Sequence, residues 1–351
     1  MIDLSILKNI NCGLGQIALN YARFYEKTYF RTSAGFDLFL LVPSAMVGKF
    51  GNEVQYVKSN WCRKHLPFFS KRVDVWHSIH QLSRYRPYGK KTNIILTVHD
   101  FNFWYEKDGV KADRYLKKIQ ARINRANIII CISEFAKKET IRFSTLNGKP
   151  IKVIYNGVEN FVGSLAEQPA KLPGSRPFFF SIGQIKEKKN FHVLIPLMKY
   201  FPDYDLIIAG QDNGQYASFI KNEIDRCGVN NVSLIGEVNH AERVWLYKNC
   251  TAFFFPSLFE GFGLPVIEAL LFGKPVFSSK ETSLQEIGGD RVFFWNNFDT
   301  EYMFQVVNDN LESFYENNEN SQLNKEYALQ FSYEKHLQAY DEIYKAALGL
   351  L

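Results

Sequence analysis

The seven residues FEGFGLP, at positions 259–265, decide how this chain folds and where its site is expected. The mostly apolar run TAFFFP (251–256) precedes them, and an apolar stretch over 264–271 follows them. This order predicts a buried strand, a tight glycine turn and the start of a helix, where backbone N–H groups bind anions. Glu260 and Glu268 can accept hydrogen bonds from neutral hydroxyl groups. Phosphate beside hydroxyl groups is the chemistry of a nucleotide sugar.

Strand-like apolar runs alternate with helix-like segments along the whole chain. Most runs are apolar at every position, which is typical of parallel strands buried on both faces. The expected strands are 2–7, 36–42, 73–76, 93–98, 127–132 and 151–154, then 178–182, 205–209, 232–235, 252–255, 275–278 and 292–294. The expected helices include 14–27, 112–125, 134–143, 190–200, 215–227 and 241–249, with Ser133 as the N-cap of the third. The alternation predicts an α/β fold with parallel sheets.

A proline-containing stretch divides the chain. Residues 164–177 hold three prolines in a weakly apolar segment, which is typical of a linker. We therefore expect one domain over residues 1–165 and a second over residues 172–332. Ligands of such sheets bind outside the carboxyl ends of the strands, so the cleft between the domains is the expected active site.

The net charge of +6 is unevenly distributed. Residues 1–170 carry 26 Lys and Arg against 13 Asp and Glu, and the remainder carries 16 against 23. A basic half attracts anionic lipid, nucleic acid or a phosphorylated substrate, or is a solvated face without a partner. We favour an anionic membrane surface or a phosphate-bearing acceptor. Nucleic acid is not expected, because no recognition-helix, RRM or aromatic-interleaved basic motif appears.

The rest of the composition indicates a cytoplasmic protein. No apolar run approaches the ~20 residues that cross a bilayer, and the N-terminus lacks the features of a secretory signal. The five cysteines form no CxxC pair, which fits reduced thiols in the cytosol. We expect a cytoplasmic protein that is peripheral on the inner face of the plasma membrane.

Several segments, in this order along the chain, resemble landmarks of the retaining GT-B glycosyltransferases of family 4. The stretch SLFEGFGLPVIEALLFGKPV (257–276) is similar to the donor-binding signature of that family. The other segments are NCGLG (11–15), TVHD (97–100), CISEFAKK (131–138), VIYNGV (153–158), GQIKEKKN (183–190) and FSYE (331–334). The resemblance implies two Rossmann-like domains facing across a cleft. It also implies a C-terminal helix, over residues 333–351, that crosses back to the first domain.

The resemblance assigns the donor-binding residues. It implies that Glu260 accepts hydrogen bonds from the donor sugar and that Glu268 grips the ribose diol. Backbone groups near sugar and phosphate come from Gly261, Phe262, Gly263 and Leu264, because glycine permits close approach. Lys188 and Lys189 follow the expected strand 178–182 and are suited to phosphate as point charges. Lys186, Lys188 and Lys189 lie at the start of the expected helix, where positive charge opposes the helix dipole. This unfavourable placement favours a role of these lysines in binding an anionic ligand.

The remaining expected residues lie in the glycine loops and after the strand 93–98. Gly13 and Gly15 open the first helix and, by resemblance, border the diphosphate, and Gly183 opens the second domain's motif. His99 closes its strand and, by resemblance, contacts the reacting sugar. The family often has arginine where this chain has Gln184, so one expected phosphate contact is absent.

A metal site is not expected. His77 and His80 could be taken for a metal pair, but no Glu or Cys cluster supports one, so we expect them to line the acceptor side. A dinucleotide-binding dehydrogenase is also disfavoured. Ala18 stands at the last position of the GxGxxG pattern, and Asp37 lies at the wrong end of strand two.

These features predict a retaining, metal-independent hexosyltransferase that needs no cofactor beyond its nucleotide-sugar donor. His99, Glu260 and Lys189 are the expected catalytic residues, and catalysis is expected to be mostly positioning and electrostatics. The acceptor is a glycan or lipid-linked saccharide of surface polysaccharide or lipopolysaccharide synthesis. The motif over 183–190 resembles that of relatives that use GDP-mannose, which we therefore favour as the donor, with UDP-glucose, UDP-galactose and UDP-GlcNAc left open. A GT-B-fold sugar epimerase or hydrolase is the alternative.

Overall fold

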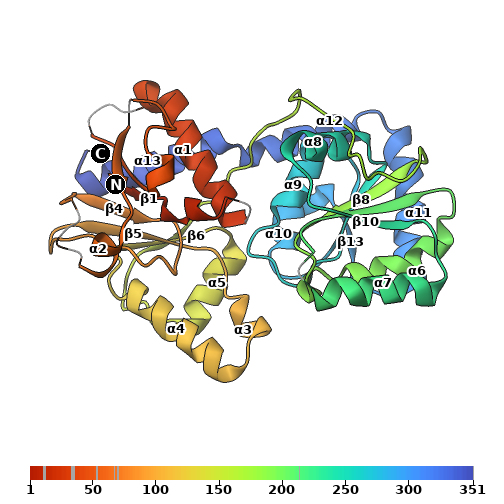
Figure 1. Cartoon of the computed structure of the whole chain (residues 1–351), viewed down its shortest axis with the longest axis horizontal. Coiled ribbons are helices and arrows are strands. Elements are labelled where there is room, and N and C mark those ends of the chain that lie inside the picture. Colours follow the sequence, from red (N-terminus) through yellow and green to blue (C-terminus); the bar gives the residue numbers. More distant parts are fainter. Residues whose placement is uncertain are drawn as a thin grey trace. The chain divides into compact units, whose positions relative to one another are not determined.

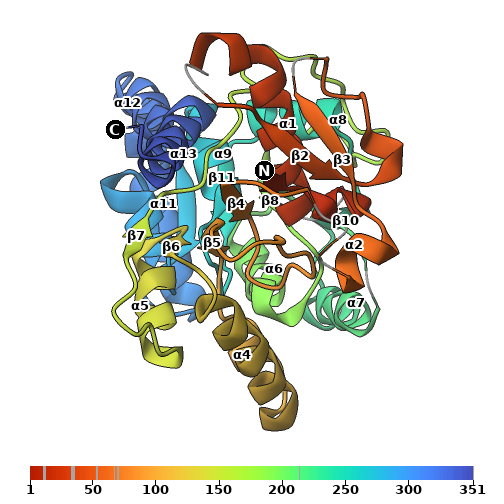
Figure 2. The same ribbon diagram turned by 90° about the vertical axis from the view of Figure 1, so that its left-hand side faces the viewer.

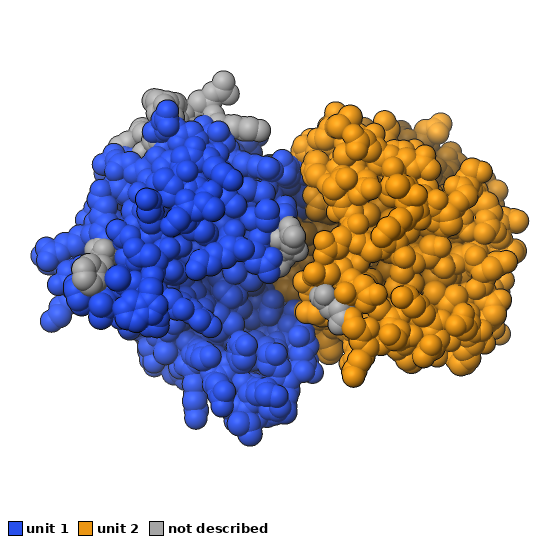
Figure 3. Space-filling view, viewed as in Figure 1, with its two compact units in different colours: residues 1–159, 333–351 blue, residues 160–332 orange. Residues whose placement is uncertain are grey.

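The computed structural model describes residues 1–10, 13–32, 36–52, 54–66, 68, 71–212 and 214–350. The chain divides into two compact units (Figure 3). Unit 1 comprises residues 1–159 and 333–351, and unit 2 comprises residues 160–332. The C-terminal segment predicted to cross back therefore belongs to unit 1.

The division of the chain lies between residues 159 and 160, ahead of the break expected around 166–171. Aromatic packing explains the difference. The ring of Phe161 lies 5.5 Å from the ring of Phe272 and 6.3 Å from that of Tyr247, centroid to centroid. The chain therefore joins unit 2 at Phe161, and the proline-containing stretch runs within that unit.

Unit 1 is built on a seven-stranded parallel sheet with the strand order β3-β2-β1-β4-β5-β6-β7 (Figure 1). Its strands are β1 (Ile2–Asp3), β2 (Phe39–Val42), β3 (Gln55–Lys58), β4 (Val75–Ser78), β5 (Asn93–Val98), β6 (Ile128–Cys131) and β7 (Ile151–Val153). Its first helices are α1 (Gly13–Thr32), α2 (Trp61–His65), α3 (Phe103–Glu106), α4 (Gly109–Ile123) and α5 (Glu134–Phe143). The order reverses between β1 and β4, and Rossmann-like sheets bind ligands beyond the carboxyl ends of the strands at this switch point.

The last helix, α13 (Tyr333–Leu348), packs on α1 and β4 of unit 1 (Figures 1 and 2). Part of this contact is polar. The ring of His336 lies 2.9 Å from the hydroxyl of Tyr21 through Nε2, and Tyr25 donates to Asp341 over 3.0 Å. Buried hydrogen bonds as well as apolar packing therefore fix the returning helix to unit 1.

Unit 2 repeats this plan with a six-stranded parallel sheet of order β10-β9-β8-β11-β12-β13. Its strands are β8 (Phe178–Ile182), β9 (Asp205–Ala209), β10 (Val232–Gly236), β11 (Ala252–Phe255), β12 (Val276–Ser279) and β13 (Phe293–Trp295). Its helices are α6 (Leu194–Leu197), α7 (Gln215–Cys227), α8 (His240–Asn249), α9 (Leu264–Leu271), α10 (Leu284–Gly288), α11 (Thr300–Glu316) and α12 (Asn320–Ala328). Figure 1 shows α6 and α7 on one face of this sheet and α8 and α9 on the other. The switch point lies between β8 and β11.

Three elements differ from the sequence-based expectation. The predicted strand 2–7 is short, because the chain turns into a 3-10 helix over Ser5–Lys8. Strand β3 was not predicted. The helix expected over 190–200 consists of α6 between two 3-10 turns, Phe191–Val193 and Met198–Tyr200. Asn190 has a left-handed backbone (φ 55°) and Pro196 lacks an N–H donor, and both interrupt a continuous helix.

Candidate functional site

Two predicted site residues meet at the switch point of unit 2. Nζ of Lys189, from the segment after β8, lies 2.5 Å from Oε1 of Glu260, from the segment after β11. Both side chains are largely buried, with 12% and 15% of their surface exposed. The ammonium group also lies 4.9 Å from the ring centroid of Phe255, at the end of β11. The structure therefore places a cation and a carboxylate side by side where such sheets bind ligands.

The turn that carries Glu260 is held by hydroxyl groups from its own segment and from the loop after β12. Ser257 Oγ donates to Oε1 of Glu260 over 2.7 Å, and the Glu260 N–H donates to Oγ1 of Thr282 over 3.0 Å. Ser283 Oγ lies 2.9 Å and 3.0 Å from the carbonyl oxygens of Glu260 and Phe262. Sequence reasoning assigned no individual role to these three hydroxyl residues, although Ser257 opens the stretch 257–276.

Two predicted glycines make room for the site. A Cβ atom on Gly183 would lie 3.0 Å from Cε of Lys189, so glycine leaves space for the lysine side chain. Gly263 has φ +107°, and a Cβ there would lie 2.6 Å from Cδ2 of Leu284. Only glycine adopts that conformation readily. Gly263 is the N-cap residue of α9, which begins at Leu264 with Pro265 in its first turn.

Lys188 joins the site through its backbone. Its carbonyl oxygen accepts hydrogen bonds from the N–H of Leu258 over 2.8 Å and from Oγ of Ser257 over 3.2 Å. These bonds tie the 3-10 turn Glu187–Lys189 to the segment after β11. A phosphate contact by the Lys188 side chain remains a prediction.

Glu268 lies on α9, is 9% exposed, and is held by two residues of α8. Tyr247 donates to Oε2 over 2.8 Å, and Nη1 of Arg243 lies 3.4 Å from Oε1. Burial, followed by the negative charge of Glu268, raises the pKa of Tyr247 well above its usual value. Sequence reasoning missed Arg243 and Tyr247, because their helix carries no recognisable motif.

His99 follows β5 in unit 1 and is 5% exposed. Its Nε2 lies 2.7 Å from the carbonyl oxygen of Ile79, and its backbone N–H donates to Gln81 over 3.1 Å. A carbonyl oxygen only accepts hydrogen bonds, so Nε2 carries the proton and Nδ1 is the acceptor. Burial lowers the pKa of His99 to about 4, so the ring is neutral near pH 7.

The glycines Gly13 and Gly15 lie in the first turn of α1, also in unit 1. A Cβ on Gly15 would lie 2.0 Å from the carbonyl oxygen of Asn9, so glycine is needed for this close packing, whereas Gly13 has open space. Asn11 and Cys12 of the predicted loop lie outside the described residues. The predicted site residues thus fall into two sets, one at the carboxyl edge of each sheet.

The expectation that His77 lines an acceptor site is wrong. The side chain is wholly buried, with Nδ1 2.7 Å from the hydroxyl of Tyr344 and Nε2 2.8 Å from Oγ1 of Thr97. It therefore joins β4 to β5 and α13 within the core. Among the described residues, no three His, Cys, Asp or Glu side chains gather as metal ligands would.

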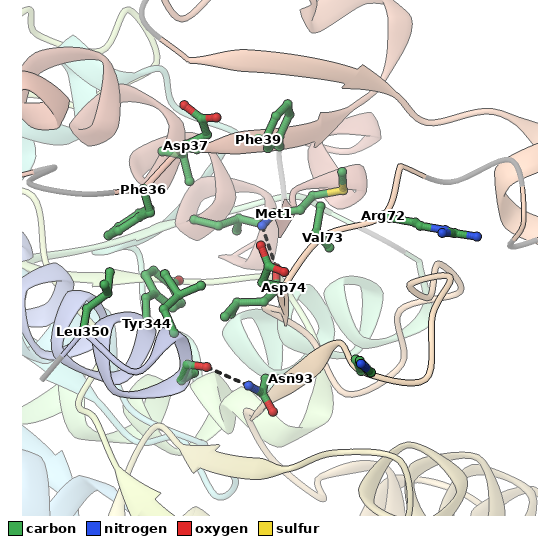
Figure 4. A pocket seen from close by; sticks show the side chains of 16 residues that line it. Met1, Phe36, Asp37, Phe39, Arg72, Val73, Asp74, Asn93, Tyr344 and Leu350 are labelled. Atoms are coloured by element: carbon green, nitrogen blue, oxygen red, sulfur yellow. Dashed lines mark hydrogen bonds between the residues drawn. The ribbon is translucent and has the colours of Figure 1, made fainter.

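A cavity of about 590 Å³ lies at the opposite, amino-terminal edge of the unit 1 sheet (Figure 4). Its lining includes Met1, whose amino group donates to the Val75 carbonyl over 2.8 Å, and Asn93, whose side chain donates to Ala347 over 2.6 Å. None of the predicted site residues lines this cavity.

Two family models match the chain, and together they cover most of it. The description "Glycosyl transferases group 1" matches residues 165–330, and "Glycosyltransferase Family 4" matches residues 46–160. Among curated proteins, O-antigen chain mannosyltransferase RfbU of Salmonella typhimurium is 27% identical over 263 residues, 74% of this chain and 70% of that protein.

Two Escherichia coli proteins are also similar. O-antigen chain mannosyltransferase B is 27% identical over 217 residues, 56% of this chain and 55% of that protein. Serotype-specific mannosyltransferase WbdA is 30% identical over 217 residues, 57% of this chain and 26% of that protein. The match therefore spans about half of the first relative and about a quarter of the second.

Solved structures show the same fold. Anabaena Alr3699/HepE in complex with UDP has a TM-score of 0.74 at 16% identity, covering 98% of both chains. The same protein with UDP-glucose has a TM-score of 0.72, and sucrose-phosphate synthase from Thermosynechococcus elongatus has 0.70 at 16% identity, covering 94% of this chain and 93% of that one. Two Rossmann-like parallel sheets, matched to these family models and structures, place this chain among the GT-B glycosyltransferases of family 4.

Proposed function

We propose that this protein is a retaining hexosyltransferase that moves mannose from GDP-mannose to a hydroxyl group of a glycan or lipid-linked saccharide in O-antigen synthesis of lipopolysaccharide. The names of RfbU and mannosyltransferase B support the sugar and the pathway. One structural observation carries the proposal: the Lys189–Glu260 pair at the switch point of unit 2. It sets a phosphate-binding cation beside a hydroxyl-binding carboxylate.

In this proposal the nucleotide sugar lies along the carboxyl edge of the unit 2 sheet. Lys189 and the N–H groups at the start of α9 bind the diphosphate. Among the described residues, both contacts of the Glu260 carboxylate use Oε1, so Oε2 accepts from the donor sugar. Glu268 binds the ribose diol, and Tyr247 and Arg243 hold its carboxylate in position.

The proposed reaction is a front-face displacement. The acceptor oxygen bonds to the anomeric carbon while the bond from that carbon to the diphosphate oxygen breaks, and the departing oxygen takes the acceptor's proton. Lys189 stabilises the charge that develops on the diphosphate, so no metal is required. Nδ1 of neutral His99 accepts a hydrogen bond from a sugar hydroxyl and helps to orient the reacting group.

A UDP-sugar-dependent transferase is the second candidate, because Alr3699/HepE was solved with UDP and UDP-glucose. A thermal-shift panel of GDP-, UDP- and dTDP-sugars separates the two. A ligand at about 100 times its Kd adds about 2.7 kcal/mol of stability. We expect GDP-mannose to give the largest shift. A shift with UDP-sugars alone contradicts the mannose assignment, and no shift with any of them contradicts the transferase assignment.

The stereochemistry and the metal requirement are tested on the product. We expect NMR of the anomeric proton to show the configuration of the donor retained, with the rate unchanged by EDTA. An inverted product or complete loss of activity in EDTA contradicts the mechanism. Rapid complete conversion of the donor to an epimer without acceptor would instead support the epimerase alternative.

We also propose that the protein works in the cytoplasm, peripherally on the inner face of the plasma membrane. The excess of Lys and Arg over residues 1–170 supports attraction to anionic lipid. Among the described residues, no helix combines the length and apolarity needed to cross a bilayer. At low salt we expect co-sedimentation with anionic liposomes but not with neutral ones, and failure to bind either contradicts the membrane assignment.

A further inference from the structure

A second cavity, of about 320 Å³, lies at the switch point of the unit 1 sheet. The segments after β1 and β4 form most of it, and α2 contributes one side chain. Its polar lining includes Asp3, Lys8, Lys64, His80 and Arg84. We call these lining residues the switch-point pocket. Its position matches that of the Lys189–Glu260 pair in unit 2, because both follow the two strands between which the sheet order reverses.

The switch-point pocket carries an excess of positive charge. Lys8, Lys64 and Arg84 form no ion pair with any described carboxylate. The one carboxylate in the lining, Asp3, is buried and accepts hydrogen bonds from the Ser5 N–H over 3.0 Å and from the Ser83 hydroxyl. Burial raises the pKa of the Asp3 carboxyl group.

The histidine in the lining, His80, does not alter this excess of positive charge. Burial lowers the pKa of His80 to about 3, so the ring is neutral near pH 7. Three cations therefore face a cavity whose only carboxylate is already engaged. Uncompensated cations around a cavity favour an anionic ligand.

Further cations surround the same loop. Nε of Arg122, on α4, donates to the carbonyl oxygen of Ser83 over 3.0 Å. Burial, followed by the charges of Arg125 and Arg86, lowers the pKa of Arg122, so three guanidinium groups lie close enough to repel one another. Among the described residues none of the three is paired with a carboxylate. The positive field therefore extends beyond the pocket.

The cavity at the amino-terminal edge of the same sheet shows that this excess is local. There Arg72 and Lys91 share the lining with Asp37 and Asp74, so positive and negative side chains are balanced (Figure 4). The general basicity of unit 1 does not by itself produce the charge of the switch-point pocket. The two cavities offer matched pairs of cations for comparison.

An exposed aromatic side chain lies on α2, the helix that lines the switch-point pocket through Lys64. The hydroxyl of Tyr85, which lines it, reaches the carbonyl oxygen of Asn60 over 3.4 Å, and Asn60 caps α2. On that helix Trp61 is 67% exposed, and Phe68 shortly after it is 55% exposed. Aromatic side chains in such positions suit the boundary between lipid and water. The helix that contributes Lys64 to the pocket therefore also presents an apolar contact.

We propose that the switch-point pocket binds a phosphate or diphosphate group of the acceptor, at the junction between its saccharide and its lipid. The proposal rests on the transferase function proposed above and names the acceptor chemistry. Lys8, Lys64 and Arg84 donate charge-assisted hydrogen bonds to the phosphate oxygens. The lipid chain of the acceptor then extends out of the pocket alongside Trp61.

The test measures binding of two probes to the full-length protein by calorimetry, with the donor site saturated by the nucleoside diphosphate that binds it best. The probes are inorganic pyrophosphate and farnesyl diphosphate below its micelle concentration. The variant Lys64→Ala/Arg84→Ala removes two pocket cations, and Arg72→Ala/Lys91→Ala removes the same charge at the other edge. We expect affinity for both probes to fall about tenfold or more in the first variant. In the second we expect a change of less than about twofold.

The outcomes separate this proposal from the proposed function. Equal affinities in the two double variants overturn the pocket assignment, whatever the donor panel shows. If farnesyl diphosphate binds more tightly than pyrophosphate and Trp61→Ala removes the difference, the lipid is part of the ligand. If both probes bind alike, the pocket recognises the phosphate group alone, and the proposal stands without the lipid contact. A protein that binds no nucleotide sugar but passes the probe test contradicts the transferase function only.

Discussion

The two sheets share one strand order over six strands but carry different side chains at their switch points. In unit 2 the segments after β8 and β11 hold Lys189 and Glu260 in an ion pair that is largely shielded from water. In unit 1 the segments after β1 and β4, together with α2, present Lys8, Arg84 and Lys64, none of which forms an ion pair with a described carboxylate. The comparison teaches that one Rossmann-like plan can carry two kinds of edge. In unit 2 the cation is paired with a carboxylate, whereas in unit 1 the cations have no carboxylate partner among the described residues, as we propose for a site that binds an anion.

Breaking the ion pair of unit 2 has the largest expected effect. Lys189→Met removes the cation that faces the departing diphosphate, so we expect kcat/KM to fall about 100- to 1,000-fold, equivalent to about 3–4 kcal/mol. Steady-state kinetics with donor and acceptor measures it. Lys186→Met, an exposed lysine on the same segment, is the control and should change the rate less than about twofold. A Lys189→Met enzyme with more than a third of the normal rate contradicts the assignment.

We expect a fall in pH to lower the free energy of unfolding of unit 1 more than that of unit 2. Burial lowers the pKa values of His99 and His336 to about 4, below the ordinary 6.5, so the unfolded chain binds these protons first. Their contribution to stability is complete above pH 6.5 and is lost as the pH falls towards 4. We expect each of these two histidines to lose about 2 kcal/mol of stabilisation by pH 5. The lowered pKa of His80 adds to this loss, whereas the raised pKa of Asp3 acts in the opposite sense.

Calorimetric melting at pH 7 and pH 5 measures this difference. We expect the transition of unit 1 to move to lower temperature by more than that of unit 2, whose His192 is only half-buried. His336→Gln removes one titrating group and should reduce the shift. Equal shifts of both transitions contradict the account.

Glu268→Gln tests the proposed role of the Glu268 carboxylate in binding the donor. The amide keeps an acceptor for Tyr247 but cannot neutralise Arg243 or bind the ribose diol with a full charge. We expect the Kd for the nucleotide to rise about tenfold, or about 1.5 kcal/mol. Calorimetric titration measures it, with Tyr247→Phe as the control that keeps the carboxylate. The assignment fails if Tyr247→Phe weakens binding as much as Glu268→Gln does.

Gly263→Ala has the smallest expected effect. Alanine must adopt φ +107° and place its Cβ 2.6 Å from Leu284, so we expect a loss of about 1–2 kcal/mol in stability and weaker donor binding. Gly13→Ala is the matched control, because its Cβ meets nothing within 4 Å. Chemical denaturation measures both variants, and equal stability would show that the turn relaxes at little cost.

Local patterns predicted most of the fold. Apolar runs located β5, β8, β9 and β11 to the residue, because strands buried on both faces have uniform composition. Strand β3 was missed, since only Val57 of its four residues is buried, as expected for the edge of a sheet. The boundary between the units was displaced, because the packing of Phe161 on Phe272 joins residues more than 100 positions apart.

Part of the site was also predictable from local patterns in the sequence. Lys189, Glu260 and Glu268 stand in segments whose residue types and order carry a signal. The partners that hold them, such as Thr282, Arg243 and Tyr247, come from other elements and are visible only after folding. His77 shows the converse, because its partner Tyr344 is 267 residues away and buries a side chain that the sequence alone placed at the surface of a site.

The central claim, that the donor binds at the switch point of unit 2, is tested most directly by hydrogen–deuterium exchange with and without GDP-mannose. The account predicts slower exchange in residues 183–190 and 257–268, and loss of that protection in Lys189→Met. Protection elsewhere, with these two segments unchanged by every nucleotide sugar in the panel, would contradict it.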